Sequence, residues 1–211
     1  MRFAKAALVA LALGGCMSVS GEPSAGFVDP EVARAFIALE GRTYVVMENR
    51  GAAFVIAPGI AVTNAHNEDF LYNASVIGVS RNYDLLFFRV DRAAAPVYGS
   101  PAVGERVVAY GQGSKGEVRE ARGIVRLLDQ PVEARCETCV VQAAFTYEGK
   151  AGPGFSGGPV VDAASGAIVG ITFGYNDVDG HRLMYAYSMN RVRNELAAIE
   201  GRIPTAVDRA K

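Results

Sequence analysis

Short apolar runs recur about every dozen residues along most of this chain, separated by Gly, Pro, Asn and Asp. β-Branched and aromatic residues dominate these runs, which is typical of the strands of an all-β protein built as a barrel. Stretches with helical periodicity are scarce. The runs predict strands at residues 43–48, 52–56, 60–63, 74–79, 85–90, 106–110, 118–128, 139–145, 159–162, 167–173 and 183–187.

Two helices are expected, one before and one after these strands. Asp29 can accept a hydrogen bond at the N-cap, Pro30 suits the first helical position, and Glu31 is favoured at the positive end of the helix dipole. The pattern extends this first helix to about Glu40. A closing helix is expected over residues 190–200, and residues 201–211 form a polar tail.

The composition narrows the class of protein. The chain has 211 residues, half of them hydrophobic, which is enough for one domain with one or two small cores. Its formal net charge of −1 provides no basic surface for nucleic acid. The sequence therefore predicts a single-domain protein that does not bind nucleic acid.

Three residues of complementary chemistry stand at strand edges. Ser156 lies within GPGFSGGPV, residues 152–160, on a glycine-rich turn before an apolar run. His66 follows the apolar run that ends at Thr63, and Asp84 begins another run 18 residues later. Acyl transfer needs a hydroxyl nucleophile, an imidazole that takes its proton, and a carboxylate that fixes the tautomer of that imidazole. The sequence therefore predicts a Ser-His-Asp catalytic triad.

These motifs resemble those of the chymotrypsin-like serine proteases. Thr63-Asn64-Ala65-His66 matches the family's T-x-x-H, the segment from Asp84 matches its aspartate-strand motif, and Phe155-Ser156-Gly157-Gly158-Pro159 is similar to its nucleophile motif. The short interval between His66 and Asp84 is similar to the compact bacterial branch, which includes the periplasmic high-temperature-requirement proteases.

The resemblance implies an all-β fold of two six-stranded antiparallel β-barrels with the active site in the cleft between them. The first barrel would cover about residues 42–92 and the second about 104–188, within a protease domain of residues 29–200. A peptide substrate would bind as an added strand. No metal and no cofactor are expected.

The resemblance also assigns further site residues. The backbone N–H groups of Gly154 and Ser156 would form the oxyanion hole. Phe155 departs from the aspartate that many family members have there, so no activation switch of the trypsin type is expected. Five residues would bound the substrate pocket, namely Lys150, Thr172, Phe173, Gly174 and Leu183.

Alternatives remain open for each part of this site. Gly-Phe-Ser-Gly-Gly also fits the nucleophile elbow of α/β-hydrolase esterases, which requires a following helix and a later histidine, here His181. A silent protease-fold binding protein is a third possibility. Asp69 is a poorer substitute for Asp84, because it lies in the segment directly after His66, and Lys150 can be a solvated loop lysine.

The amino terminus indicates export. Arg2 and Lys5 precede an apolar run that is too short to span a bilayer, and Leu13-Gly14-Gly15-Cys16 resembles the lipobox of bacterial lipoproteins. This resemblance implies a signal peptide over residues 1–15, lipid attachment at Cys16 and a tether over residues 16–28. The protein would then face the periplasm from a bacterial membrane, and Met17 favours the outer one. A plain signal peptide or a buried helix is the alternative.

The two remaining cysteines, Cys136 and Cys139, are three positions apart. In an exported protein a disulfide across a tight turn is the favoured interpretation. A zinc site is disfavoured because few other ligands are available, and a thioredoxin-type site needs its Cys-x-x-Cys at a helix start.

Overall fold

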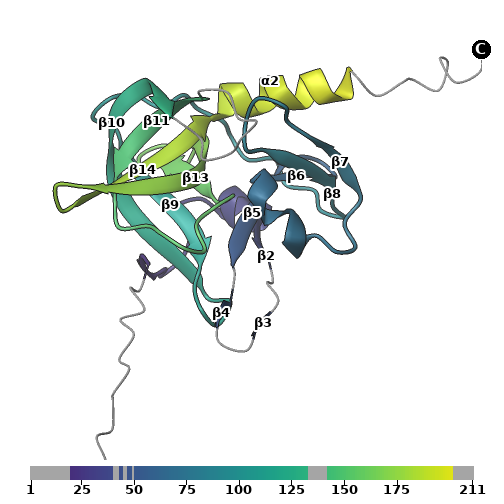
Figure 1. The fold of residues 1–211 in the computed structure, drawn as a ribbon, viewed down its shortest axis with the longest axis horizontal. Helices are drawn as coiled ribbons and strands as arrows, with labels where there is room; N and C mark the ends of the chain where they lie inside the picture. The colour runs from purple at the N-terminus through teal and green to yellow at the C-terminus, as the bar shows by residue number, and fades with distance from the viewer. Residues whose placement is uncertain (1–19, 40–42, 45–46, 49, 133–141, 202–211) are drawn as a thin grey trace, which may run out of the picture.

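The computed structural model describes residues 20–39, 43–44, 47–48, 50–132 and 142–201, and the following account is confined to them. Figure 1 shows two β-sheet bodies side by side, with helix α2 lying along one side of both. Within these residues, no helix combines the length and the apolar character needed to cross a membrane.

The C-terminal half forms a closed barrel of six antiparallel strands. The ring runs β9, β10, β11, β14, β13, β12 and back to β9, because β9 pairs with both β10 and β12. A short strand β1, Glu22–Pro23, adds to the outside of this ring on β10. The barrel strands are β9 (Arg106–Gln112), β10 (Val118–Val132), β11 (Gln142–Glu148), β12 (Pro159–Asp162), β13 (Ile168–Val178) and β14 (His181–Ser188).

The N-terminal half forms a five-stranded sheet in the order β2, β5, β6, β8, β7. Within the described residues this sheet is not closed, so the expected pair of barrels is confirmed only for the second one. A hairpin of β3 (Thr43–Tyr44) and β4 (Met47–Glu48) forms a separate two-stranded sheet. The strands of the open sheet are β2 (Phe36–Leu39), β5 (Gly51–Ala57), β6 (Ile60–Thr63), β7 (Val76–Val79) and β8 (Leu86–Arg89).

Local sequence explains several of these elements. Helix α1, Pro30–Ala35, begins at Asp29, whose Oδ1 accepts the N–H of Glu31 at 2.7 Å. The expected extension of this helix to Glu40 is wrong. Residues 36–39 instead pair with β5 as strand β2, and burial of Phe36 and Leu39 in this pairing outweighs a weak helical preference.

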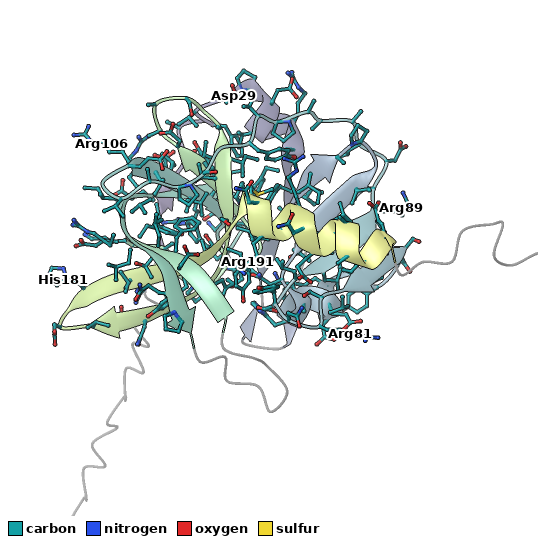
Figure 2. All side chains as sticks on the ribbon, turned by 90° about the horizontal axis from the view of Figure 1, so that it is seen from above. Asp29, Arg81, Arg89, Arg106, His181 and Arg191 are labelled. Carbon is teal, nitrogen blue, oxygen red and sulfur yellow. The ribbon has the colours of Figure 1, made fainter. Side chains whose placement is uncertain are left out.

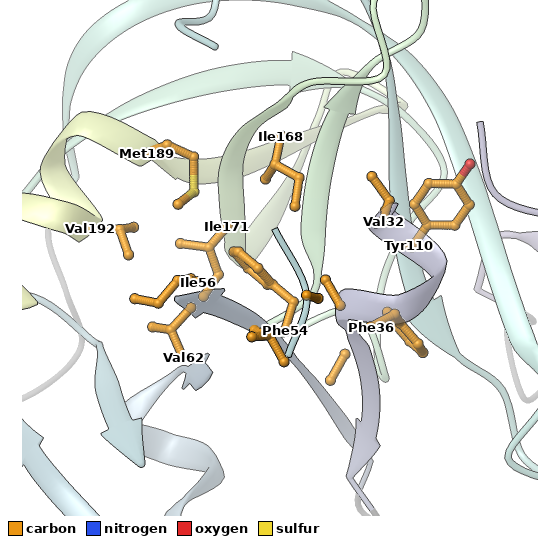
Figure 3. Close-up of a cluster of buried hydrophobic side chains, with 14 of the residues drawn as sticks. Val32, Phe36, Phe54, Ile56, Val62, Tyr110, Ile168, Ile171, Met189 and Val192 are labelled. Atoms are coloured by element: carbon orange, nitrogen blue, oxygen red, sulfur yellow. The ribbon is translucent and has the colours of Figure 1, made fainter. Parts of the chain in front are cut away.

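The main core lies between the two sheets. Side chains from the open sheet meet side chains from the barrel and from both helices, as Figure 3 shows. Helix α2, Met189–Glu200, lies where the closing helix was expected and buries Met189, Val192 and Ile199. A second apolar cluster fills the barrel itself, and it contains Phe155. The two halves therefore share one core, which fixes the loops of one half against those of the other.

Candidate active site

His66 and Asp84 come together at one edge of the open sheet. His66 lies on the short 3-10 helix η1, Ala65–Phe70, after β6, and Asp84 lies two residues before the start of β8. The Asp84 carboxylate binds the histidine twice: Oδ2 lies 2.6 Å from His66 Nδ1, and Oδ1 accepts the His66 backbone N–H at 3.0 Å. This pairing fixes the imidazole with Nε2 as the ring nitrogen that is left for another partner.

Two polar residues, Asn64 and Tyr187, lie next to Asp84. The side-chain amide of Asn64 donates to the backbone carbonyl of Asp84 at 2.9 Å. Tyr187, from barrel strand β14, is buried close to the same residue. Burial above all, with a contribution from the negative charge of Asp84, raises the pKa of Tyr187. The Tyr187 hydroxyl therefore stays neutral at physiological pH.

Ser156 belongs to the loop that enters strand β12 of the barrel. Its backbone carbonyl accepts the N–H of Ala52 at 2.8 Å and the side-chain amide of Asn67 at 3.0 Å. Because Asn67 is the residue after His66, this hydrogen bond brings the serine loop next to the histidine. The Asn67 amide also donates to Thr63 Oγ1 at 2.9 Å, and Thr63 Oγ1 donates to the Ala52 carbonyl at 2.7 Å.

This network was not predicted from the sequence. In the structure its two side chains are buried, Asn67 being 1% and Thr63 0% exposed. A buried asparagine must find partners, because an unpaired amide in the core is costly. The available signal was an asparagine directly after His66 and a polar residue closing an apolar strand. Neither residue pattern identifies its partner on the distant loop.

Two glycines shape the serine loop. Gly154 has φ +93° and Gly157 has φ +83°, a region that residues with a side chain rarely adopt. A Cβ atom at Gly154 would fall on the carbonyl oxygen of Gln112, and one at Gly157 on that of Ala52. Within the described part of the chain, the N–H groups of Gly154 and Ser156 donate to no backbone or side-chain acceptor. Two donors beside the serine are thus available to an anion.

The five predicted pocket residues fall into two groups. Thr172 and Phe173 lie in β13 beside the serine loop, and the Thr172 carbonyl accepts the N–H of Gly157 at 2.9 Å. Phe173 stacks on Tyr187 with ring centroids 4.1 Å apart. Gly174 pairs with Tyr185 of β14, and a Cβ atom at Gly174 would meet nothing within 4 Å, so the space beside this glycine is open.

The second group comprises Lys150 and Leu183. Lys150 is exposed, and its carbonyl accepts the N–H of Gly21 at 2.8 Å. Leu183 is half-buried on β14, where it pairs with Glu148 and Asn176. The predicted acylation site Cys16 and the predicted disulfide partners Cys136 and Cys139 lie outside the described residues.

The geometry does not fit the esterase alternative. Ser156 is followed by strand β12 from Pro159, whereas a nucleophile elbow is followed by a helix. His181, the histidine that this alternative needs, lies at the start of β14 on the hairpin that projects from the barrel (Figure 2), with its side chain 75% exposed. Its Nδ1 lies 3.2 Å from Glu148 Oε1.

Among the described side chains, no three of His, Cys, Asp or Glu form a group able to hold a metal ion.

Comparison with known structures finds the same fold in bacterial proteases. The active form of the Rv3671c protease from M. tuberculosis superposes with a TM-score of 0.66 at 21% identity, covering 98% of this chain and 96% of that one. The HtrA-type protease AlgW with a tripeptide gives 0.62 at 21% identity, covering 80% and 62%. The MamO protease domain from Magnetospirillum magneticum gives 0.60 at 16% identity, covering 78% and 97%.

Comparison of sequences gives the family. No curated protein matches the chain. The sequence model of the trypsin-like peptidase domain, however, matches residues 45–171, which is well over half of the 211 residues and includes His66, Asp84 and Ser156. The chain therefore belongs to the trypsin-like peptidase family and is a serine protease.

Proposed function

We propose that this protease cleaves peptide bonds of protein substrates through an acyl-enzyme, with Ser156 as nucleophile, His66 as general base and Asp84 as the orienting carboxylate. The observation that carries this proposal is the pair of hydrogen bonds that the Asp84 carboxylate accepts from His66, from Nδ1 at 2.6 Å and from the backbone N–H at 3.0 Å. It holds the imidazole in the tautomer whose Nε2 can accept a proton from a serine hydroxyl.

In the first half-reaction, Ser156 Oγ attacks the carbonyl carbon of the scissile bond while His66 Nε2 takes the hydroxyl proton. The carbonyl π-electrons move onto oxygen, and the N–H groups of Gly154 and Ser156 stabilise this anion. When the tetrahedral intermediate collapses, the C–N bond breaks and the imidazolium gives its proton to the leaving amine. In the second half-reaction, His66 Nε2 takes a proton from water as the water oxygen attacks the ester carbon. The ester C–O bond then breaks, and the imidazolium returns the proton to Ser156 Oγ.

The substrate is expected to pair with the barrel as an added strand along residues 172–174. The open space beside Gly174 supports this proposal, and structures of AlgW have been solved with a tripeptide and with a decapeptide. Thr172 would contribute backbone only, because its Oγ1 is buried 2.9 Å from the Tyr147 hydroxyl. Phe173, Leu183 and Lys150 would complete the pocket, as the sequence predicts.

A complete first barrel is also part of this proposal. The β3–β4 hairpin would have to join the open sheet, which would give the protease the usual two-barrel frame around its substrate.

Cys136 and Cys139 would form a disulfide, testable by the absence of maleimide labelling before reduction and its appearance afterwards.

The proposed location is the periplasmic side of a bacterial membrane, most simply the outer one, with lipid attached to Cys16. The packing of Ser20 and Gly21 on the barrel supports a shorter tether than residues 16–28. Cys16 and Ser20 are four positions apart in the sequence, a stretch of chain that spans at most about 14 Å. Labelling with radioactive palmitate that disappears in Cys16→Ser would support the anchor, and an unlabelled wild-type protein recovered wholly from the soluble periplasm would exclude it.

A fluorophosphonate probe tests the catalytic assignment directly. The wild-type protein should be labelled on Ser156, and Ser156→Ala should not. Ser165→Ala is the matched control, because Ser165 lies on a distant turn where it bonds Asp162. Turnover of a casein-derived peptide, rather than of a simple acetyl ester alone, would establish the endopeptidase. An unlabelled wild-type protein would instead indicate a silent binding protein.

A further inference from the structure

The segment Ser20–Ser24, which we call the N-terminal strap, is attached to the barrel along its whole length. Glu22 and Pro23 pair with Glu120 and Arg119 of β10, and the N–H of Ser24 donates to the carbonyl of Val118 at 3.0 Å. In Figure 1 this purple end of the ribbon lies against the barrel. These residues therefore behave as part of the folded domain.

Arg119 holds the strap at its other end. Its Nε donates to the carbonyl of Ser20 and its Nη2 to the carbonyl of Gly21, each at 2.6 Å. The residue is only 9% exposed, and hydrogen bonds from a buried charged group are among the stronger ones in proteins. A planar guanidinium can bind two carbonyls at once, whereas an ammonium group offers no such fixed fork.

Beneath the strap lies the loop that leads to Ser156. The N–H of Gly21 donates to the carbonyl of Lys150 at 2.8 Å, and Ser20 packs against Gly152, where an added Cβ would lie 2.9 Å from Ser20 Oγ. Gly21 has φ +64°, and a Cβ atom there would lie 2.6 Å from Cζ of Phe155. The strap thus contacts the start, the middle and the end of the loop.

Phe155 connects the strap to the two donors beside the serine. Its ring is fully buried in the barrel cluster, and its N–H donates to the carbonyl of Gly152 at 3.1 Å. On one side the ring touches Gly21, and on the other it approaches Gly111. Because Phe155 stands between Gly154 and Ser156, its burial fixes the directions in which both of their N–H groups point.

We propose that the N-terminal strap, clamped by Arg119, is a positioning element that holds the oxyanion-hole loop through Phe155. This inference rests on the proposed function, since it assigns a role to the support of the same N–H groups. Loosening the strap would uncover Phe155 and free the Lys150 carbonyl. The loop would then populate other conformations, and activity would fall with the fraction of molecules in the competent one.

The test compares Gly21→Ala, Arg119→Met and Arg119→Lys in the full chain. Gly104→Ala is the matched control for backbone strain, because Gly104 has φ +86° and open space around its Cβ position. We expect kcat to fall about tenfold to a hundredfold in Gly21→Ala and Arg119→Met, less than the 10²–10³ lost with an outright oxyanion donor. Arg119→Lys should fall between Arg119→Met and wild type, and Gly104→Ala should keep wild-type kcat.

A second measurement separates positioning from general destabilisation. A peptide aldehyde forms a tetrahedral adduct with Ser156 and needs the oxyanion hole, whereas the parent peptide bound to a Ser156→Ala background does not. In strap variants the affinity for the peptide aldehyde should fall by the same factor as kcat. The affinity for the parent peptide should stay within about twofold of wild type. Hydrogen exchange at residues 152–156 should become faster in the same variants.

The outcomes distinguish this proposal from the one on which it rests. If wild-type protein neither turns over peptide nor reacts with fluorophosphonate, the proposed function fails. If wild type is active while folded Arg119→Met and Arg119→Lys retain full kcat and full aldehyde affinity, the strap proposal is overturned and the triad stands. Should Gly21→Ala not fold, the two Arg119 variants decide the question alone.

Discussion

The two halves of the molecule supply their parts of the site by different physical means. The barrel positions Ser156 through backbone packing: Gly154 and Gly157 adopt positive φ values against carbonyl oxygens that a side chain would strike. The open sheet positions His66 and Asp84 through side-chain hydrogen bonds at the ends of short strands. The barrel side is therefore sensitive to shape, and the sheet side is sensitive to chemical identity.

The difference indicates where substitutions would be tolerated. A loop held by close backbone approach loses its geometry when a single methyl group is added. A hydrogen-bonded pair keeps its geometry when an isosteric group replaces the carboxylate, but it loses the charge and the tautomer that catalysis needs. The following experiments use this contrast, from the largest expected effect to the smallest.

The reacting pair lies across the two halves, so its removal should have the largest effect. Ser156→Ala should lower kcat by roughly 10⁶, and His66→Ala should be comparably severe, as for the triad of another serine protease. The double variant should be no worse than either single one, because the two residues act as a unit. Steady-state hydrolysis of a peptide substrate measures this, and additive losses would show that Ser156 and His66 work independently.

On the sheet side, Asp84→Asn should cost about 10⁴ in kcat while the fold is preserved. The amide can still orient the imidazole, but it favours the wrong tautomer and cannot stabilise the imidazolium. Asp69→Asn, on the exposed surface of helix η1, is the matched control and should remain within about twofold of wild type. An exchange of these two results would make Asp69 the third member of the triad.

On the barrel side, Gly157→Ala should reduce the free energy of unfolding by about 3 kcal/mol, combining left-handed strain with overpacking. Gly59→Ala is its control. Gly59 also has a positive φ, +76°, but the nearest atom to an added Cβ is the Val90 carbonyl oxygen at 3.7 Å. That variant should lose about 1 kcal/mol, from strain alone. Urea unfolding measures both, and equal losses would mean that close packing at Gly157 contributes nothing.

The smallest effect concerns the contact between the halves. The hydroxyl of Tyr98, whose backbone forms a bridge with Ile168 of the barrel, donates to the Ile56 carbonyl of the open sheet at 2.6 Å. Tyr98→Phe should cost about 1 kcal/mol at neutral pH, the usual contribution of one hydrogen bond. Unfolding free energies of the two proteins, measured from pH 7 to 12, test this value.

The same contact predicts a pH dependence. Burial raises the pKa of Tyr98 to about 12, from 10.0 in the unfolded chain. Above pH 10 the unfolded protein releases this proton while the folded protein keeps it, so unfolding becomes more favourable as the pH rises toward 12. The advantage of wild type over Tyr98→Phe should therefore shrink between pH 10 and pH 12. A constant difference across this range would exclude Tyr98 as the titrating group.

Many strands of both sheets could be predicted because they follow local patterns of residues. The runs around β5, β6, β8, β12 and β13 are apolar and bounded by turn residues, and the structure has strands there. The Pro58-Gly59 turn is typical in the same way, since Gly59 takes the positive φ that this turn requires. Local pattern failed at residues 36–39, where pairing with β5 converts the expected end of a helix into strand β2.

The sequence by itself determined the approximate positions of most strands, the family, and the order His66, Asp84, Ser156, because each depends on a short motif or on a local alternation of residues. Only the tertiary structure decided that Asp84 rather than Asp69 bonds His66, that Asn67 ties the sheet to the serine loop, and that Phe155 lies buried under Gly21. These are contacts between residues that are distant along the chain or on separate loops. They depend on how two sheets pack, and no local pattern of residues specifies that packing.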